Sequence, residues 1–443
     1  MDKKRLKLNI NRKNVDWITL TILGILIFPY LFFIGEYAFD FLGKYYYAIT
    51  GVIALTLFLI FKLPKLLKNI KNVRNINGRT KALLVLVAIF VLYLFIILLF
   101  NNISLDDYLF ANLLMVFLFV FCFSDFNEDT LKVLSILSLA CITYLTFKNF
   151  IFGRSLFFNP NTYSYLFTIL TICFSCYFYI NPSKNGIRLV VLVFLISLVN
   201  DLVIYESDAQ IVALGLLGLL LIHSKKIIEN KKLYVAITLG LFVIVASFGF
   251  IVNFLIRNDI LIDETFISYR GQIFMQAVEV LCSYSVTLVK CYPFTGLYGE
   301  FYEAVATSPH NGFLDACFRL TPLGACIFLI IFAFIVIASL KNFKKDKTSI
   351  FLYFSAITLI LLNTVESFML GLNDAYFVLI ILGALVSRLF LGKNNPSLQD
   401  GIYKTQETDT QTTTETPIDT PTETSLETDI KEDKELSGEN VDV

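Results

Sequence analysis

The chain has 443 residues, of which 56% are hydrophobic and only 16% are charged, and its mean hydropathy is +0.71. So few charges cannot cover the apolar surface of a soluble domain, which excludes that class and predicts a polytopic membrane protein. Lys and Arg number 36, as do Asp and Glu, so the net charge is zero and carries no information on orientation. We expect no nucleic-acid partner.

The predicted fold is all-α, with about twelve transmembrane helices. Residues 1–16 form a basic N-terminus. No small-residue cleavage site follows the first apolar run, so we expect a retained span rather than a signal peptide. A window of roughly 20 residues, which crosses about 30 Å of hydrocarbon, identifies the spans. Their centres lie near Ile27, Thr56, Phe90, Phe117, Leu139, Leu170, Phe194, Leu216, Phe242, Ile331, Leu359 and Ile380.

The basic residues predict how these spans are oriented. With the N-terminus in the cytoplasm, the inner segments before the tail hold 24 Lys and Arg, and the outer segments hold seven. The positive-inside rule then requires an even number of spans and a cytoplasmic C-terminus. We therefore predict helices 1–9 over residues 17–256, an outer loop over 257–322 and helices 10–12 over 323–393. Residues 394–443 are rich in Thr, Glu and Asp, which predicts a disordered acidic cytoplasmic tail.

The outer loop is too long to be a simple connector, and it carries the most chemically suggestive residues. His310 and Asn311 precede apolar residues at helical spacing, which predicts a helix N-terminus where free backbone N–H groups favour an anion. Arg270 opens a second stretch with Phe274 and Val278 on one side, which predicts an amphipathic helix on the outer leaflet. A guanidinium there offers a bidentate fork for phosphate. A histidine that only caps its helix and an arginine that snorkels to headgroups are the alternatives.

The eight cysteines give no sign of a metal centre. Cys173 and Cys176 form a C-x-x-C inside an apolar span, so we expect them to pack rather than to bind metal. Cys282, Cys291 and Cys317 lie in or near the outer loop, where a disulfide is chemically allowed, and the sequence leaves their pairing open. The outer loops contain no Asp-x-Asp pair, so we expect neither a metal requirement nor a cofactor.

Several short motifs follow one another in a definite order. They are Asn159-Pro160-Asn161 before one span, Glu206-Ser207-Asp208 at the start of another, Arg270, Pro293 with Gly296, and His310-Asn311-x-Phe313-Leu314. In this order the chain resembles the O-antigen ligase and Wzy-type polysaccharide polymerase superfamily over roughly residues 155–370. The twelve predicted spans and the outer loop between the ninth and tenth also look like that family, which implies a GT-C-like fold.

The resemblance implies a metal-independent glycosyltransferase in a bacterial plasma or inner membrane. Such an enzyme polymerises undecaprenyl-diphosphate-linked oligosaccharide repeat units into a capsule, O-antigen or exopolysaccharide. Its partners would be the lipid-linked oligosaccharide, the bilayer, and flippase and chain-length regulator proteins. By the same resemblance His310 is the general base on the acceptor hydroxyl, and Arg270 binds the donor diphosphate and stabilises the departing charge.

The chain departs from the family pattern at Ser207-Asp208, where the family often has Ser-Arg. Arg257 or Arg154 would then supply the missing contact with the diphosphate. The residues implied to orient the acceptor or the histidine are Asn311, Asn161 and Glu206.

Three alternatives remain open at this stage. A carboxylate of an outer loop could be the base instead, the candidates being Glu36, Asp40, Asp106 and Asp107. A ligase would use the same donor with a different envelope acceptor. A transporter or lipid-linked glycan flippase also fits twelve spans, although few charges lie within the spans and the only long loop is off-centre.

Overall fold

The protein is known here from a computed structural model. It describes residues 10–32, 53, 56–57, 60–61, 64, 78–100, 127–152, 160–205, 207–260, 270–283, 296–297, 305–306, 309–342 and 347–365. The chain divides into one unit over Met1–Lys393 and a second over Asn394–Val443. The predicted acidic tail corresponds to the second unit and lies outside the described residues.

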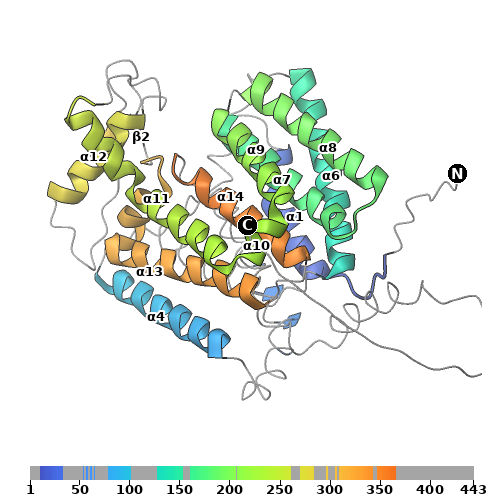
Figure 1. Ribbon diagram of the computed structural model, residues 1–443, viewed down its shortest axis with the longest axis horizontal. Coiled ribbons are helices and arrows are strands. Elements are labelled where there is room, and N and C mark those ends of the chain that lie inside the picture. Colours follow the sequence, from blue (N-terminus) through green and yellow to red (C-terminus); the bar gives the residue numbers. More distant parts are fainter. Residues whose placement is uncertain are drawn as a thin grey trace, which may run out of the picture. The chain divides into compact units, whose positions relative to one another are not determined.

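The described chain is built almost entirely of helices (Figure 1). These are α1 (Trp17–Phe32), α4 (Gly78–Phe100), α6 (Glu128–Phe152), α7 (Pro160–Ile180), α8 (Lys184–Val199), the π-helix η4 (Asn200–Tyr205), α9 (Asp208–Ile222), α10 (Ser224–Glu229), α11 (Lys231–Arg257), α12 (Arg270–Ser283), α13 (Gly312–Asn342) and α14 (Lys347–Leu362). Two strands of two residues, β1 (Gly296–Leu297) and β2 (Val305–Ala306), pair antiparallel within the predicted outer loop.

Membrane-length helices confirm that this is a helical membrane protein. Among the residues that the structure describes, five segments are long and apolar enough to cross a bilayer: Glu128–Ile151, Tyr163–Ile180, Lys184–Tyr205, Lys232–Arg257 and Gly312–Ala338. Shorter apolar helices occupy Asp208–Ile222 and Ser349–Leu362. The predicted centres at Phe117 and Ile380 lie outside the described residues, and Thr56 lies among isolated described positions. The count of twelve spans therefore stays a prediction.

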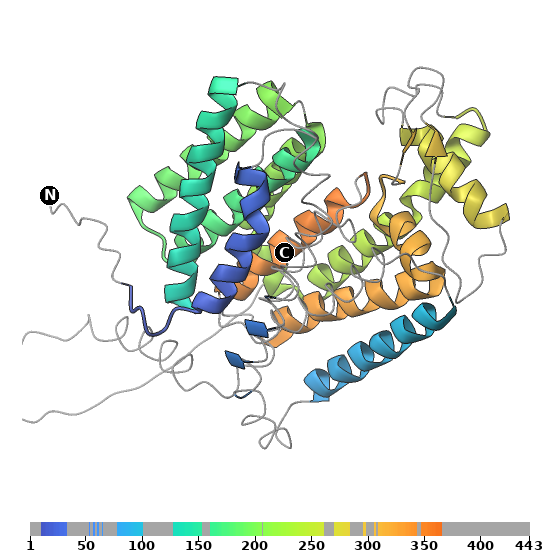
Figure 2. The same cartoon turned by 180° about the vertical axis from the view of Figure 1, so that it is seen from behind.

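Helix α7 is the most enclosed of these segments, and most of its length is buried. It packs along α6 and also contacts α8, α9 and α14. Helix α14 contacts α9 and α7 on one side and α11 and α13 on another, so it connects the two groups of helices seen in Figures 1 and 2. Large apolar side chains such as Leu99, Phe150 and Ile222 remain exposed on outward faces, as expected for surfaces that meet lipid.

Helix α13 is broken near its start. Thr321 has a φ of 64° and a ψ of 162°, and the next residue is Pro322, which has no backbone N–H to continue a helical ladder. The hydroxyl of Tyr93, on α4, lies 2.5 Å from Thr321 Oγ1 and ties the break to a neighbouring helix. The stretch that begins at Gly312 is therefore a separate helical segment, in part of the chain predicted as the end of the outer loop.

Helix α12 is amphipathic, as the spacing of its apolar residues predicts, but its apolar face packs against other helices of the protein. Phe274 and Ala277 are fully buried and Val278 nearly so, in a cluster with Val252 of α11 and Leu314 of α13. The expectation that this face rests on the outer leaflet was wrong, because the ends of α11 and α13 provide an apolar partner within the protein. Helix α12 is thus docked on the helix that follows His310.

Candidate active site

The start of α13 is held by Asn311, whose side chain is fully buried. Its Oδ1 accepts hydrogen bonds from the backbone N–H of Phe313 at 3.1 Å and of Leu314 at 2.9 Å, which is an N-cap. Its Nδ2 donates to the carbonyls of Thr364 at 3.0 Å and Val245 at 3.4 Å. Asn311 therefore fastens three helices together, and its implied contact with an acceptor stays a prediction.

The N-terminus of α13 is not an open anion site. The N–H of Gly312 donates to the carbonyl of Asn363 at 2.8 Å, and those of Phe313 and Leu314 are bonded to Asn311. The sequence predicts the helix start correctly, but free N–H groups for a phosphate were expected there, and this was wrong. Gly312 is needed at this point, since a Cβ would lie 2.6 Å from Asn363 Oδ1. Side chains, rather than the helix terminus, must supply any binding of an anion.

His310 lies immediately before this cap, with a φ of 48°, and is partly exposed. It is within electrostatic range of Asp315, one turn into α13. Asp315 is buried and accepts a 2.9 Å hydrogen bond from Nε of Arg319, with which it forms an ion pair. We call His310, Asp315 and Arg319 the His310 cluster. A carboxylate within electrostatic range of an imidazole favours the imidazolium that forms when histidine takes a proton, which helps a general base.

Two of the three predicted diphosphate-binding arginines, Arg270 and Arg257, lie on the same docked assembly. Arg270 is the first residue of α12 and is partly exposed. Arg257 ends α11, and its Nη2 lies 2.8 Å from Glu279 Oε1 on α12, while its Nε donates to Asn253 at 3.1 Å. Both partners of the Arg257–Glu279 pair are about half exposed or more, so a stronger anion could displace the glutamate at little cost.

Other predicted residues fall where the structure gives no side-chain description. Arg154 and Glu206 lie outside the described residues, as do the rival carboxylates Glu36, Asp40, Asp106 and Asp107. Asn161 is in the first turn of α7, but its side chain is outside the described part. The predicted roles of all these residues stay predictions.

In the described part of the chain the cysteines form neither a disulfide nor a metal-binding group. Cys173 and Cys176 are buried in the apolar core, as expected for packing residues. Cys282 and Cys317 are free thiols, and Cys291 lies outside the described residues. Among the described residues there is no group of three His, Cys, Asp or Glu side chains that could hold a metal ion.

A second polar cluster was missed by the reasoning from sequence. Asp201 and Asn200 open the π-helix η4, and both are buried. Ser164 of α7 donates to Asp201 Oδ1 at 2.5 Å, and Asn149 Nδ2 of α6 donates to Asn200 Oδ1 at 2.8 Å and to the hydroxyl of Tyr205 at 2.6 Å. We call these five residues the Asp201 cluster. A lone acid within an otherwise apolar span was the available signal.

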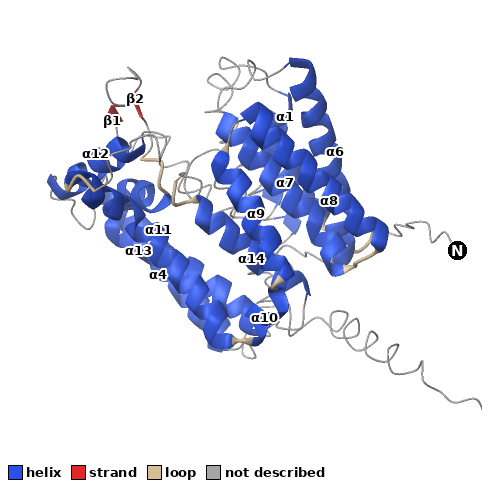
Figure 3. Cartoon of the chain, turned by 45° about the horizontal axis from the view of Figure 1, so that its top comes forward, coloured by secondary structure: helices blue, strands red, loops and turns tan. Residues whose placement is uncertain are grey.

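Both clusters lie at the same end of the helices. The ring of Tyr179, at the end of α7, is 5.5 Å from that of Phe351 near the start of α14, so these two contacting helices run antiparallel. Ser164 at the start of α7 and Asn363 at the end of α14 are therefore at the opposite end. Figure 3, tilted from the view of Figure 1, shows α7, α9 and α14 as neighbours. The charge distribution predicts that this end is the outer one.

No family model matches the chain, and neither any curated protein nor any solved structure matches it. No residue role is therefore carried over from a relative, and the resemblance drawn from the motifs stays a prediction.

Proposed function

We propose that this chain polymerises undecaprenyl-diphosphate-linked oligosaccharide repeat units at the outer face of a bacterial plasma membrane. The observation that carries the proposal is that one apolar cluster joins α12 to the end of α11 and the start of α13. This cluster keeps Arg270, Arg257 and His310 on one assembly, although they are spread over more than fifty residues of sequence. A membrane glycosyltransferase needs such an arrangement, with cations for a lipid diphosphate beside a base for an acceptor.

In the proposed reaction, His310 removes the proton from an acceptor sugar hydroxyl, and Asp315 stabilises the resulting imidazolium. The acceptor oxygen bonds to the anomeric carbon of the donor glycan while the bond from that carbon to the diphosphate oxygen breaks. The lipid diphosphate leaves with the electron pair, and the guanidinium of Arg270 stabilises the charge that develops on it. Arg257 binds the same diphosphate after its ion pair with Glu279 is replaced by a contact with the phosphate.

The glycan made by a strain that lacks this protein tests the proposal. We expect single repeat units in the deletion strain, long chains when the wild-type protein is restored, and single repeats again with His310→Ala at equal protein level. Long chains that accumulate unattached in the deletion strain would instead identify the ligase alternative, in which the acceptor is an envelope anchor.

One observation favours the transporter alternative. Asp201 is a fully buried acid inside a span, a kind of residue that often marks ion or substrate pathways in transporters. The leaflet in which the lipid-linked glycan accumulates in the deletion strain separates the two functions. Accumulation in the outer leaflet supports the polymerase, and accumulation in the inner leaflet supports a flippase.

A further inference from the structure

Asp201 is an acidic residue placed where a negative charge is costly. It has no exposed surface, and it lies in a segment, Lys184–Tyr205, that is apolar enough to cross a membrane. Removing a carboxylate from water without a compensating positive charge costs several kcal/mol or more. Burial therefore requires a partner that neutralises Asp201, either a cation or a proton.

The hydrogen bonds of Asp201 do not provide that partner. Oδ1 accepts the hydroxyl of Ser164 at 2.5 Å, and the backbone carbonyl accepts the N–H of Ser207 at 2.9 Å. Oδ2 is buried and has no hydrogen-bond partner among the residues that the structure describes. A neutral hydroxyl leaves the full charge of the carboxylate uncompensated.

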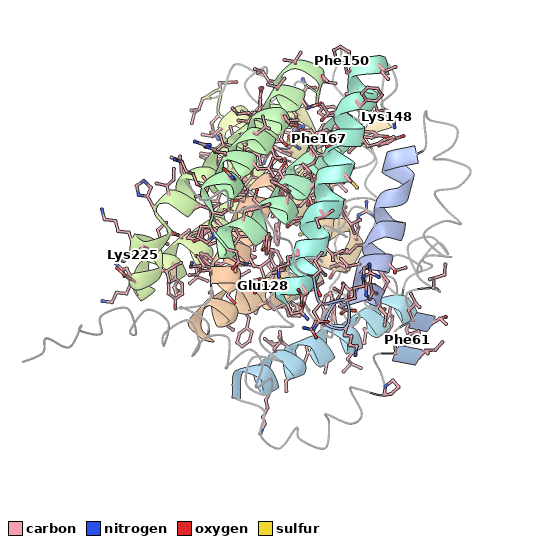
Figure 4. The ribbon with its side chains drawn as sticks, turned by 90° about the vertical axis from the view of Figure 1, so that its right-hand side faces the viewer. Phe61, Glu128, Lys148, Phe150, Phe167 and Lys225 are labelled. Atoms are coloured by element: carbon pink, nitrogen blue, oxygen red, sulfur yellow. The ribbon has the colours of Figure 1, made fainter. Side chains whose placement is uncertain are left out.

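A buried lysine on α6, next to Asn149 in the chain, is directed elsewhere. Lys148, which Figure 4 shows toward one end of α6, is buried, and its Nζ lies 5.6 Å from the ring centroid of Tyr163. That ring stacks on Tyr205, with centroids 6.4 Å apart. Between Lys148 and Asp201, which are both described, no ion pair forms, so the lysine does not neutralise this acid.

Further buried oxygens without partners lie on the helices that meet Asp201. Asn149 Oδ1 has no hydrogen-bond partner in the described chain, and Asn149 bonds to Tyr205, which is itself within electrostatic range of Asp201. Thr168 Oγ1, one turn along α7 from Ser164, is also buried and has no hydrogen-bond partner in the described chain. A carboxylate with neutral oxygens around it is a set of hard donors, of the kind that a hard cation prefers.

The backbone adds to the same preference. Asp201 lies in the first turn of the π-helix η4, directly after the C-terminal end of α8, where the dipole of α8 is negative and favours a cation. A π-helical stretch also changes the backbone hydrogen-bond ladder, and such stretches are frequent at functional sites. The carboxylate, the neutral oxygens and the helix dipole therefore all favour a bound cation.

We propose that the Asp201 cluster binds one monovalent alkali cation, for which Na⁺ is the probe. The single carboxylate balances a single positive charge, and Asn149 together with the hydroxyls of Ser164 and Thr168 completes the oxygen shell. The cation links α6, α7 and the end of α8, which meet at this cluster. The proposal does not depend on glycan transfer, because it concerns a separate set of residues.

Thermal unfolding of the full-length protein in detergent tests it, with NaCl replacing choline chloride at constant ionic strength. We expect Na⁺ to raise the Tm of the wild type by about 3 °C or more, since a ligand that binds only the folded state stabilises it. Asp201→Asn keeps the shape and the contact with Ser164 and should lose the response to Na⁺. Asp208→Asn, an exposed acid seven residues further along, should keep it.

A wild-type Tm that depends on pH but not on Na⁺ would overturn the proposal, because a proton would then neutralise Asp201. If Asp201→Asn fails to accumulate, Asn149→Ala provides the second variant, with an expected rise of about tenfold in the Na⁺ concentration at half-maximal stabilisation. Binding of radioactive Na⁺ measures the same site directly and should be equal in the wild type and in Asp208→Asn. Saturable binding that is unchanged in Asn149→Ala would also contradict the proposal.

Discussion

At the level of single residues, the proposed role of His310 as a base gives Asp315 a part in the reaction. The imidazole is partly exposed before the cap of α13, and the buried carboxylate lies within electrostatic range of it. Arg319 pairs with the same carboxylate at 2.9 Å and holds its orientation. Asp315 and Arg319 are four residues apart, a spacing that places both on one face of a helix. That spacing is a local signal in the sequence.

Replacing Asp315 by Asn should therefore lower the rate of chain extension while the protein still folds. A histidine base contributes about 10²- to 10⁴-fold, and loss of the group that stabilises its protonated form should cost about tenfold or more of that. His310→Ala combined with Asp315→Asn should be no slower than His310→Ala alone, because the two residues act as a unit. If the factors by which the two single substitutions lower the rate multiply in the double variant, Asp315 acts independently of His310.

Substitutions in the Arg257–Glu279 pair test whether Arg257 binds the donor or only stabilises the fold. Both side chains are largely exposed, so either single substitution should change the free energy of unfolding by less than about 1 kcal/mol. Arg257→Ala should nevertheless weaken use of the lipid-linked donor, because it removes a cation for the diphosphate. Glu279→Ala, the matched control, should leave donor use equal or improved. Equal losses in both variants would mean that the pair only holds α11 and α12 together.

At the level of elements, the start of α13 depends on one buried cap. Asn311→Ala should cost about 2–3 kcal/mol, since it removes the N-cap and the side-chain donor to the carbonyl of Thr364. Asn230 caps α11 through the N–H groups of Lys232 and Leu233 on an exposed surface. Asn230→Ala should cost only about 1 kcal/mol. Unfolding in detergent measures both, and equal losses would refute the interhelical role of Asn311.

The helices and their docking differ in how far the sequence predicts them. The apolar spacing around Phe274 and Val278 correctly predicts helix α12, because that signal is local. Its docking depends on Val252 and Leu314, which are far away in the chain, and no local pattern reports such a partner. The satisfied N–H of Gly312 likewise depends on the carbonyl of Asn363, which is far away in the chain. Asp201 was overlooked because the apolar run around it was interpreted only as a span.

At the level of the whole molecule, the charge distribution predicts which end of the helices faces outward. Cys282 is an exposed free thiol on α12, within the predicted outer loop. In a variant that keeps only this cysteine, a membrane-impermeant thiol reagent should label it in intact cells whose outer barrier has been opened. Lys225→Cys in a chain without other cysteines provides the inner control and should react only in inverted vesicles. The reverse pattern would place the predicted active site in the cytoplasm.

The most direct measurement is chain extension by the purified protein. The lipid-linked repeat unit that accumulates in the deletion strain is the substrate, and product length is followed after reconstitution into lipid vesicles. We expect long lipid-linked chains from the wild type and from His223→Ala, whose histidine is exposed near the opposite end of the helices. His310→Ala should yield only the starting single repeat. Full-length polymer from His310→Ala, or none from the wild type, would contradict the assignment of this chain as a polymerase that uses His310 as its base.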